Sequence, residues 1–235
     1  MTSGRWTLPV LAAALAAVVW AIPLQVGVYA DAVITDIPVY QRAYDAIAGG
    51  NVPYADFTLE YPPLAAGLFW LAGVLPGPYG VTFSILMLLC LCATVVGVVF
   101  LARAIGLDGR RQTVAAVLVA VSPLLIGNLV ETRFDMALAA ILTWTLWAAV
   151  TERWRLAWGL LAAATLLKLV PLVLIPVMML WQAHRDTARR AWTGALAAVA
   201  AVAIVIVAVL PATSGTVATV MPVGSDDAVS VTGPW

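Results

Sequence analysis

The chain has 235 residues, of which 63% are hydrophobic and 10% are charged, with a formal net charge of zero and a mean hydropathy of +1.01. A soluble domain carries roughly 25% charged residues, so this composition excludes an ordinary water-soluble protein and predicts an all-α, multi-pass membrane protein. Acidic and basic residues are equal in number, which gives no reason to expect a nucleic-acid partner.

The first apolar run covers about residues 8–29, which is long enough to cross a bilayer as one helix. The apolar core of a cleaved signal peptide is shorter, so we predict a retained first span with a cytoplasmic N-terminus. Six further apolar runs bring the prediction to about seven membrane segments; they lie at about 64–76, 81–104, 113–128, 135–150, 156–181 and 192–210.

Arginines between these runs set the predicted orientation. Three clusters should face the cytoplasm by the positive-inside rule: Arg103, Arg110 and Arg111; Arg153 and Arg155; and Arg185, Arg189 and Arg190. Residues 30–80 then form an outer loop, and only one full crossing fits between this loop and Arg103. The short run 64–76 is therefore predicted to be an interfacial or re-entrant helix on the outer side.

The run 156–181 has basic clusters on both flanks, so it must cross the membrane an even number of times, yet it is too short for two ordinary spans. Lys168 and Pro171 lie near its middle. We predict two short or tilted helices that meet near Lys168, which then faces an outer or mid-membrane cavity. The alternative is one long tilted span with a buried lysine, which would violate the charge rule.

These segments make one predicted transmembrane domain, residues 1–210, which includes the outer loop. Residues 211–235 lose the apolar periodicity and are rich in Thr, Ser, Gly and Val. We expect them to form an irregular outer tail, which a truncated or frameshifted gene would explain.

The outer loop carries the first candidate site residue, Asp36. Ile37 and Pro38 follow it, so Asp36 can be the N-cap of a helix in which Tyr40 and Tyr44 share one face. A carboxylate beside an apolar wall can also be a general base that deprotonates a sugar hydroxyl. Both interpretations stay open.

The segment NVPYADFTLEYPP, residues 51–63, contains three prolines, which predict an ordered, extended backbone. Asp56, Glu60 and Tyr61 would project from it. The two carboxylates could bind a sugar hydroxyl, a divalent ion or water. No tight DxD pair or nearby histidine accompanies them, so we predict no metal site.

Three isolated cations lie on the predicted outer side, namely Arg42, Arg133 and Lys168. Each could pair with a neighbouring acid, as Arg133 could with Glu131 or Asp135. Together they could instead hold a lipid phosphate, since arginine and lysine both bind phosphate near a bilayer.

The pattern of one span followed by this loop resembles bacterial glycosyltransferase family 87, the polyprenol-phosphate-mannose-dependent α-mannosyltransferases of the GT-C superfamily. The residues that carry the resemblance are Asp36, Tyr40, Gly49-Gly50, Pro53-Tyr54 and Tyr61-Pro62-Pro63 before a short helix. The later LLKLVPLVLIP, with Lys168 and Pro171, is similar to the family's K-x-x-P segment. The resemblance covers about residues 8–210, and family members have further spans beyond that point.

The resemblance implies a GT-C-like fold and a membrane enzyme that moves a hexose, mannose, from a polyprenyl-phosphate sugar to a glycolipid or glycan acceptor at the outer face, with inversion. Asp36 would be the general base, Glu60 would orient a sugar, and Arg133 and Lys168 would stabilise the leaving phosphate. No metal or cofactor is required. The full set of implied substrate-binding residues is Tyr40, Arg42, Asp56, Glu60, Tyr61, Arg133, Asp135 and Lys168. A transporter or flippase and a non-catalytic fragment or membrane subunit remain the alternatives.

Overall fold

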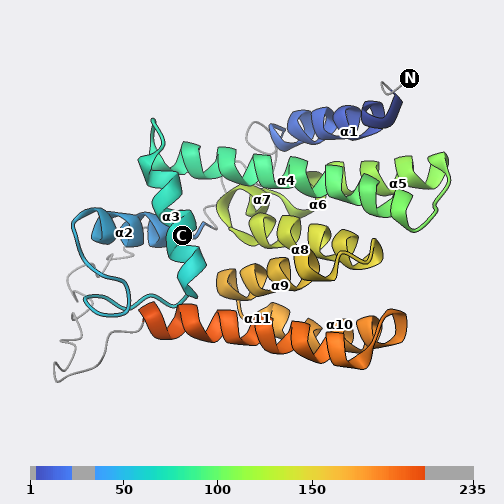
Figure 1. Ribbon diagram of the computed structural model, residues 1–235. Helices are drawn as coiled ribbons and strands as arrows, with labels where there is room; N and C mark the ends of the chain where they lie inside the picture. Colours follow the sequence, from blue (N-terminus) through green and yellow to red (C-terminus); the bar gives the residue numbers. More distant parts are fainter. Residues whose placement is uncertain (1–3, 23–34, 210–235) are drawn as a thin grey trace, which may run out of the picture.

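The computed structural model describes residues 4–22 and 35–209, and the structural statements below concern these two ranges. Every regular element in them is helical, as the all-α prediction requires, and one isolated bridge pairs Pro53 with Phe57 (Figure 1). The helices are α1 (Gly4–Trp20), α2 (Ile37–Ala48), α3 (Pro63–Val74), α4 (Tyr79–Ala104), α5 (Gly109–Ala120), α6 (Pro123–Ile126), α7 (Leu129–Thr132), α8 (Asp135–Val150), α9 (Trp154–Leu167), the 3-10 helix η1 (Val170–Val173), α10 (Leu174–Arg185) and α11 (Ala188–Val209).

Three helical stretches of the described ranges are long and apolar enough to cross a membrane: α4, the stretch Gly109–Ile126 that joins α5 and α6, and α11. Four shorter helices are also apolar: Arg5–Trp20, Pro63–Val74, Asp135–Val150 and Trp154–Leu167. These helices indicate a membrane protein. The count of about seven crossings stays a prediction, and the predicted tail 211–235 and the end of the first predicted span lie outside the described residues.

The central helix is α4, which packs against α1, α5 and α8, while α8 packs on α9 and α9 on α11. Figure 1 shows α4, α8, α9 and α11 stacked with roughly parallel axes. Close packing of α4 on α8 depends on Gly97, because a Cβ atom there would lie 2.8 Å from Thr143 Cγ2. The Trp144 indole N–H also donates a hydrogen bond to the Ala93 carbonyl at 3.2 Å across this contact.

Helix α3 runs across the ends of this stack and contacts α4, α9 and α11 (Figure 1). It begins at Pro63, where a proline suits the first helical turn, and it ends before Pro76, which would break it. Ala65, Phe69 and Ala72 form its buried face at helical spacing. Its 12 residues reach about 18 Å, less than the roughly 30 Å of a bilayer core, so the predicted short helix is confirmed as a separate element.

The predicted break near Lys168 is also confirmed. Helix α9 ends at Leu167, and Lys168 has an extended backbone with φ −154° and ψ 138°. Pro171 lies in η1, so the chain cannot continue α9 with regular hydrogen bonds, and α10 starts only at Leu174. Lys168 therefore lies at a helix end and not in the middle of a long tilted span.

The contact between α4 and α8 generates a stability prediction. Replacing Gly97 by leucine should overpack this contact and destabilise the protein by about 1–3 kcal/mol, because Thr143 and Trp144 occupy the space the new side chain needs. Thermal unfolding in detergent measures the effect. Gly67→Leu is the matched control, since a Cβ atom at Gly67 meets no atom within 4 Å. Equal melting temperatures for both variants would contradict the role of Gly97.

Candidate functional site

Asp36 lies immediately before α2 and so occupies the N-cap position. Its backbone is helical, with φ −95° and ψ −1°, and its side chain makes no capping hydrogen bond. Oδ2 instead accepts a hydrogen bond from the hydroxyl of Tyr40 at 3.2 Å. The side chain is therefore not used as a cap, so capping does not explain a carboxylate at this position.

The same Oδ2 atom of Asp36 faces Arg133, whose Nε lies 3.4 Å away. Nε makes no hydrogen bond within the described ranges, so the pairing is electrostatic. Arg133 comes from the C-terminal end of α7, far from Asp36 in sequence. The predicted pairing of Arg133 with Glu131 or Asp135 is wrong, because the fold brings Asp36, at the N-terminal end of α2, to the C-terminal end of α7.

A second ion pair joins Asp135, the first residue of α8, to Lys168, the residue that ends α9. Lys168 Nζ lies 2.5 Å from Asp135 Oδ1. The side chains of the two pairs remain 31–44% exposed. Exposed ion pairs contribute only about 0–1 kcal/mol to stability, so these two pairs leave accessible charge without much stabilising the fold.

An aromatic cluster, defined here as Tyr40, Tyr61, Phe69 and Phe134, joins the two ion pairs. The Phe134 ring meets Tyr40, Tyr61 and Phe69 edge-on, with centroid distances of 5.0–5.7 Å. Tyr40 stacks on Phe69 at 4.4 Å. The ammonium of Lys168 lies 5.4 Å from the Phe134 ring centroid. Such pairs add about 0.5–1.5 kcal/mol each to the burial of the rings, so the cluster holds α2, α3 and α8 together under the charges.

The structure thus brings together six of the predicted site residues: Asp36, Tyr40, Tyr61, Arg133, Asp135 and Lys168. Two others lie apart from this set. Arg42 is exposed on α2 and makes no ion pair within the described part of the chain. Asp56 is exposed and accepts a hydrogen bond from the Val52 amide at 2.7 Å, so it closes a local turn.

Glu60 and Tyr61 line a small cavity next to the cluster, which we name the Tyr61 cavity. It measures about 220 Å³, and its other walls are Tyr54, Pro62, Pro63, Leu169, Ile206 and Val209. The Tyr54 hydroxyl donates a hydrogen bond to the Tyr61 carbonyl at 2.5 Å, and Tyr54 has a positive φ of 67°. A bulky residue in this backbone region is strained, so the surrounding loop must hold it there. Apart from Glu60 and the tyrosines, the cavity has apolar walls.

Glu131 is a feature of the site region that sequence reasoning treated only as a partner for Arg133. It lies in the short helix α7, is 2% exposed, and its Oε1 has no hydrogen-bond partner within the described ranges. Burial raises the pKa of its carboxyl from near 4.5 to about 7. The sequence signal was its position two residues before the arginine of the site, within a turn that joins two apolar runs.

Metal ligation receives no support from the geometry of the described residues, which contain no group of three or more His, Cys, Asp or Glu side chains able to hold an ion. The sequence predictions that no metal and no cofactor take part are not tested by this observation. The six residues brought together supply two carboxylates, two cations and two tyrosine hydroxyls.

The buried Glu131 generates a prediction about pH. Its raised pKa means that the folded state keeps a proton that the unfolded state loses between about pH 4.5 and 7. Its contribution to stability is therefore full below about pH 4.5 and is lost as the pH rises through 7, by about 3 kcal/mol. Glu131→Gln should remove this dependence.

Thermal unfolding in detergent at pH 5 and pH 8 measures this difference. Glu152→Gln, at an exposed glutamate, is the matched control and should keep the wild-type dependence. If Glu131→Gln and wild type lost stability equally between the two pH values, the buried carboxyl would not be the titrating group.

Comparison with known proteins identifies the family to which the chain belongs. A family model for glycosyltransferase family 87 matches residues 57–221, which is more than half of the chain. Four predicted site residues precede the matched stretch: Asp36, Tyr40, Arg42 and Asp56. Comparison with curated proteins and with solved structures gives no match. The length of the family match and the apolar helices together establish that the protein belongs to glycosyltransferase family 87 and is a membrane glycosyltransferase.

Proposed function

We propose that the protein transfers mannose from a polyprenyl-phosphate sugar to a glycolipid or glycan acceptor, with inversion and with Asp36 as general base. The observation that carries the proposal is the position of the Asp36 carboxylate in one cluster with two cations, Arg133 and Lys168. A glycosyltransferase uses a donor and an acceptor. In this cluster the cations could bind the donor phosphate, and the carboxylate could deprotonate the acceptor hydroxyl.

The base step rests on how Asp36 is held. Both of its polar contacts, with Tyr40 and Arg133, involve Oδ2, and Oδ1 makes no hydrogen bond to a described residue. Oδ1 can therefore accept the proton of an acceptor hydroxyl. As that proton moves to Asp36, the hydroxyl oxygen bonds to the anomeric carbon. The bond from this carbon to the phosphate oxygen breaks on the opposite face, and polyprenyl phosphate leaves.

The leaving phosphate needs cations that are not fully used within the protein. Lys168 carries three N–H donors, and Asp135 takes one of them. The guanidinium of Arg133 faces Asp36 through Nε alone, and its remaining N–H groups make no hydrogen bond to a described residue. Both residues can therefore bind phosphate oxygens and stabilise the charge that develops on them.

The Tyr61 cavity suits the lipid part of such a donor. Leu169 directly follows Lys168 and lines the cavity with Ile206 of α11, so an apolar chain could lie there while its phosphate meets the lysine. Glu60, which is exposed and lines the same cavity, could accept hydrogen bonds from sugar hydroxyls. This proximity of cation, acid and apolar wall supports an amphiphilic donor.

The arginine distribution supports a site on the outer side and a cytoplasmic N-terminus. The connections α4–α5, α8–α9 and α10–α11 carry the arginine clusters and lie at one end of the stack, whereas α2 and α3 lie at the other (Figure 1). The Arg103 side chain donates a hydrogen bond to the Arg5 carbonyl at 2.6 Å, so the start of α1 belongs to the basic end. Family membership favours the enzyme over the transporter and the non-catalytic subunit.

Asp36→Asn should lower mannose transfer about 10²–10⁴-fold, because the amide cannot accept the proton that the general base removes. Asp45→Asn is the matched control, since Asp45 lies in α2 but is exposed and makes no ion pair with a described residue. Transfer of radiolabelled mannose from polyprenyl-phosphate mannose, in membranes with equal expression, measures both variants.

Equal transfer by wild type and Asp36→Asn would remove Asp36 from the mechanism. If the wild type transferred a different lipid-linked sugar and Asp36→Asn lost that transfer, Asp36 would remain the proposed base but the proposed donor would be wrong. A product with retained anomeric configuration would contradict inversion.

Lys168→Gln and Arg133→Gln should each lower kcat about 10²–10³-fold, because each removes a cation that stabilises the departing phosphate. Donor titration under single-turnover conditions separates this from a loss of donor binding. Arg110→Gln, an exposed arginine at the other end of the stack, is the control. A rise in KM with unchanged kcat would show that the cations bind the donor without stabilising the transition state.

A further inference from the structure

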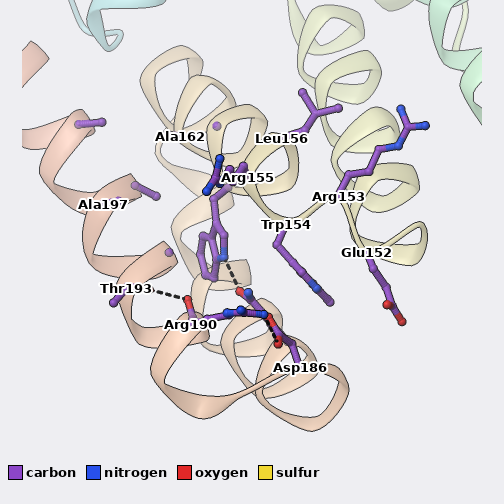
Figure 2. A pocket seen from close by; sticks show the side chains of 16 residues that line it. Glu152, Arg153, Trp154, Arg155, Leu156, Ala162, Asp186, Arg190, Thr193 and Ala197 are labelled. Carbon is purple, nitrogen blue, oxygen red and sulfur yellow. Dashed lines mark hydrogen bonds and ion pairs between the residues drawn. The ribbon is translucent and has the colours of Figure 1, made fainter.

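The basic end of the helix stack contains a cavity that the proposed glycosyl transfer does not use. We name it the basic-end cavity. It measures about 960 Å³ and lies between the start of α9, the end of α10 and the start of α11 (Figure 2). These segments lie at the end of the stack opposite α2 and α3, so this cavity is far from the aromatic cluster (Figure 1).

One buried pair of polar side chains forms the floor of the basic-end cavity. The Trp158 indole N–H donates a hydrogen bond to Gln182 Oε1 at 2.7 Å, and both side chains are at least 96% buried. Helix α11 approaches this pair closely, because a Cβ atom at Gly194 would lie 2.4 Å from Trp158 Nε1. The hydrogen bond fixes the positions of these two side chains, and Gly194 lets α11, which forms another wall of the cavity, pack close to them.

The charges around the cavity have a basic excess. Arg190 Nη1 donates a hydrogen bond to Asp186 Oδ1 at 2.9 Å, so these two neutralise each other in part. Arg153 lies over the Trp147 ring at 4.7 Å and points away from the cavity in Figure 2. Arg155 turns toward the cavity in the same view and makes no ion pair within the described ranges. Glu152, the other acid, lies beyond Trp154 on the α8–α9 turn (Figure 2).

The remaining walls are small and apolar. They come from Gly159 and Ala162 of α9 and from Ala197 and Ala201 of α11. Helix α11 is a candidate membrane span, and most of its surface is not covered by the rest of the protein. The cavity thus has a basic rim and continues into an apolar groove on a helix that meets the bilayer.

We propose that the basic-end cavity binds one anionic phospholipid, with its phosphate at Arg155 and Arg190 and an acyl chain along the groove between α9 and α11. A basic pocket between membrane helices attracts an anionic headgroup, and each nearby arginine contributes about 1 kcal/mol. A soluble anion would leave the apolar groove empty. An apolar helix packed there would bury Arg155 without a counter-ion, which is unfavourable in a membrane.

The test uses the purified 235-residue chain in detergent and native mass spectrometry with added phosphatidylglycerol or phosphatidylcholine of identical acyl chains. We expect retained adducts with phosphatidylglycerol and few with phosphatidylcholine. Arg155→Gln should weaken phosphatidylglycerol binding about fivefold. Gly159→Leu should also weaken it, because a Cβ atom at Gly159 meets no atom within 4 Å, so the leucine side chain can project into the groove and obstruct the acyl chain without a clash.

Two variants at the same end of the stack serve as controls. Gly109→Leu and Arg110→Gln change exposed residues of α5, and a Cβ atom at Gly109 likewise meets no atom within 4 Å. Both should bind phosphatidylglycerol as wild type does. Melting temperatures of all four variants check that each is folded, and the preference of wild type for phosphatidylglycerol is measured independently of them.

Four results would overturn the proposal. Equal binding of the two lipids would remove the anionic specificity, and binding unchanged in both cavity variants would place the lipid elsewhere. Displacement of the lipid by an equal concentration of glycerol phosphate would identify a site for soluble anions. A change of oligomeric state in Gly159→Leu, with lipid binding unaltered, would identify the groove as a contact between protein helices.

Discussion

The four charged residues of the candidate site all lie at helix ends, and each charge matches the dipole of its helix. Asp36 and Asp135 lie at the N-terminal ends of α2 and α8, while Arg133 and Lys168 lie at the C-terminal ends of α7 and α9. A charge near the matching helix end is stabilised by about 0.3–1 kcal/mol, whereas a charge within a membrane helix is exposed to hydrocarbon. The positions at which the helices begin and end therefore determine where these four charged side chains can be placed.

The aromatic cluster converts these separate helix ends into one site. Phe134 stands between Arg133 and Asp135 in sequence, and its buried ring touches Tyr40, Tyr61 and Phe69. Burial of one ring therefore fixes the position of a residue from each ion pair. The ion pairs contribute little to stability by comparison, so their charges stay accessible, as the proposed transfer requires.

The elements set by proline and by flanking charge could be predicted from the sequence. Pro62, Pro63 and Pro76 delimit α3, and Pro171 with the surrounding arginines indicates the break at Lys168. The membership in glycosyltransferase family 87, first indicated by the residues of the loop, is also confirmed.

Contacts between residues distant in sequence could not be predicted from local spacing. Asp36 pairs with Arg133 because the fold brings the N-terminal end of α2 to the C-terminal end of α7, whereas local spacing favoured Glu131 or Asp135. The burial of Glu131 depends on helices packed around α7, so its sequence neighbours alone did not indicate an unpaired acid. The basic-end cavity combines small residues from different helices, and glycine or alanine in a membrane helix carries no local sign of a cavity.

The end of α9 at Leu167 has a consequence for hydration. The Lys168 amide still donates to the Ala164 carbonyl, but the residues that follow are in η1, so the last carbonyls of α9 lack the donors of a further turn. Such groups are not tolerated in hydrocarbon and must be reached by water or by protein donors. The end of α9 therefore calls for water or polar protein groups beside Lys168. For the proposed donor, this hydration would let the phosphate bind at Lys168 and stay solvated while the lipid chain stays in an apolar environment.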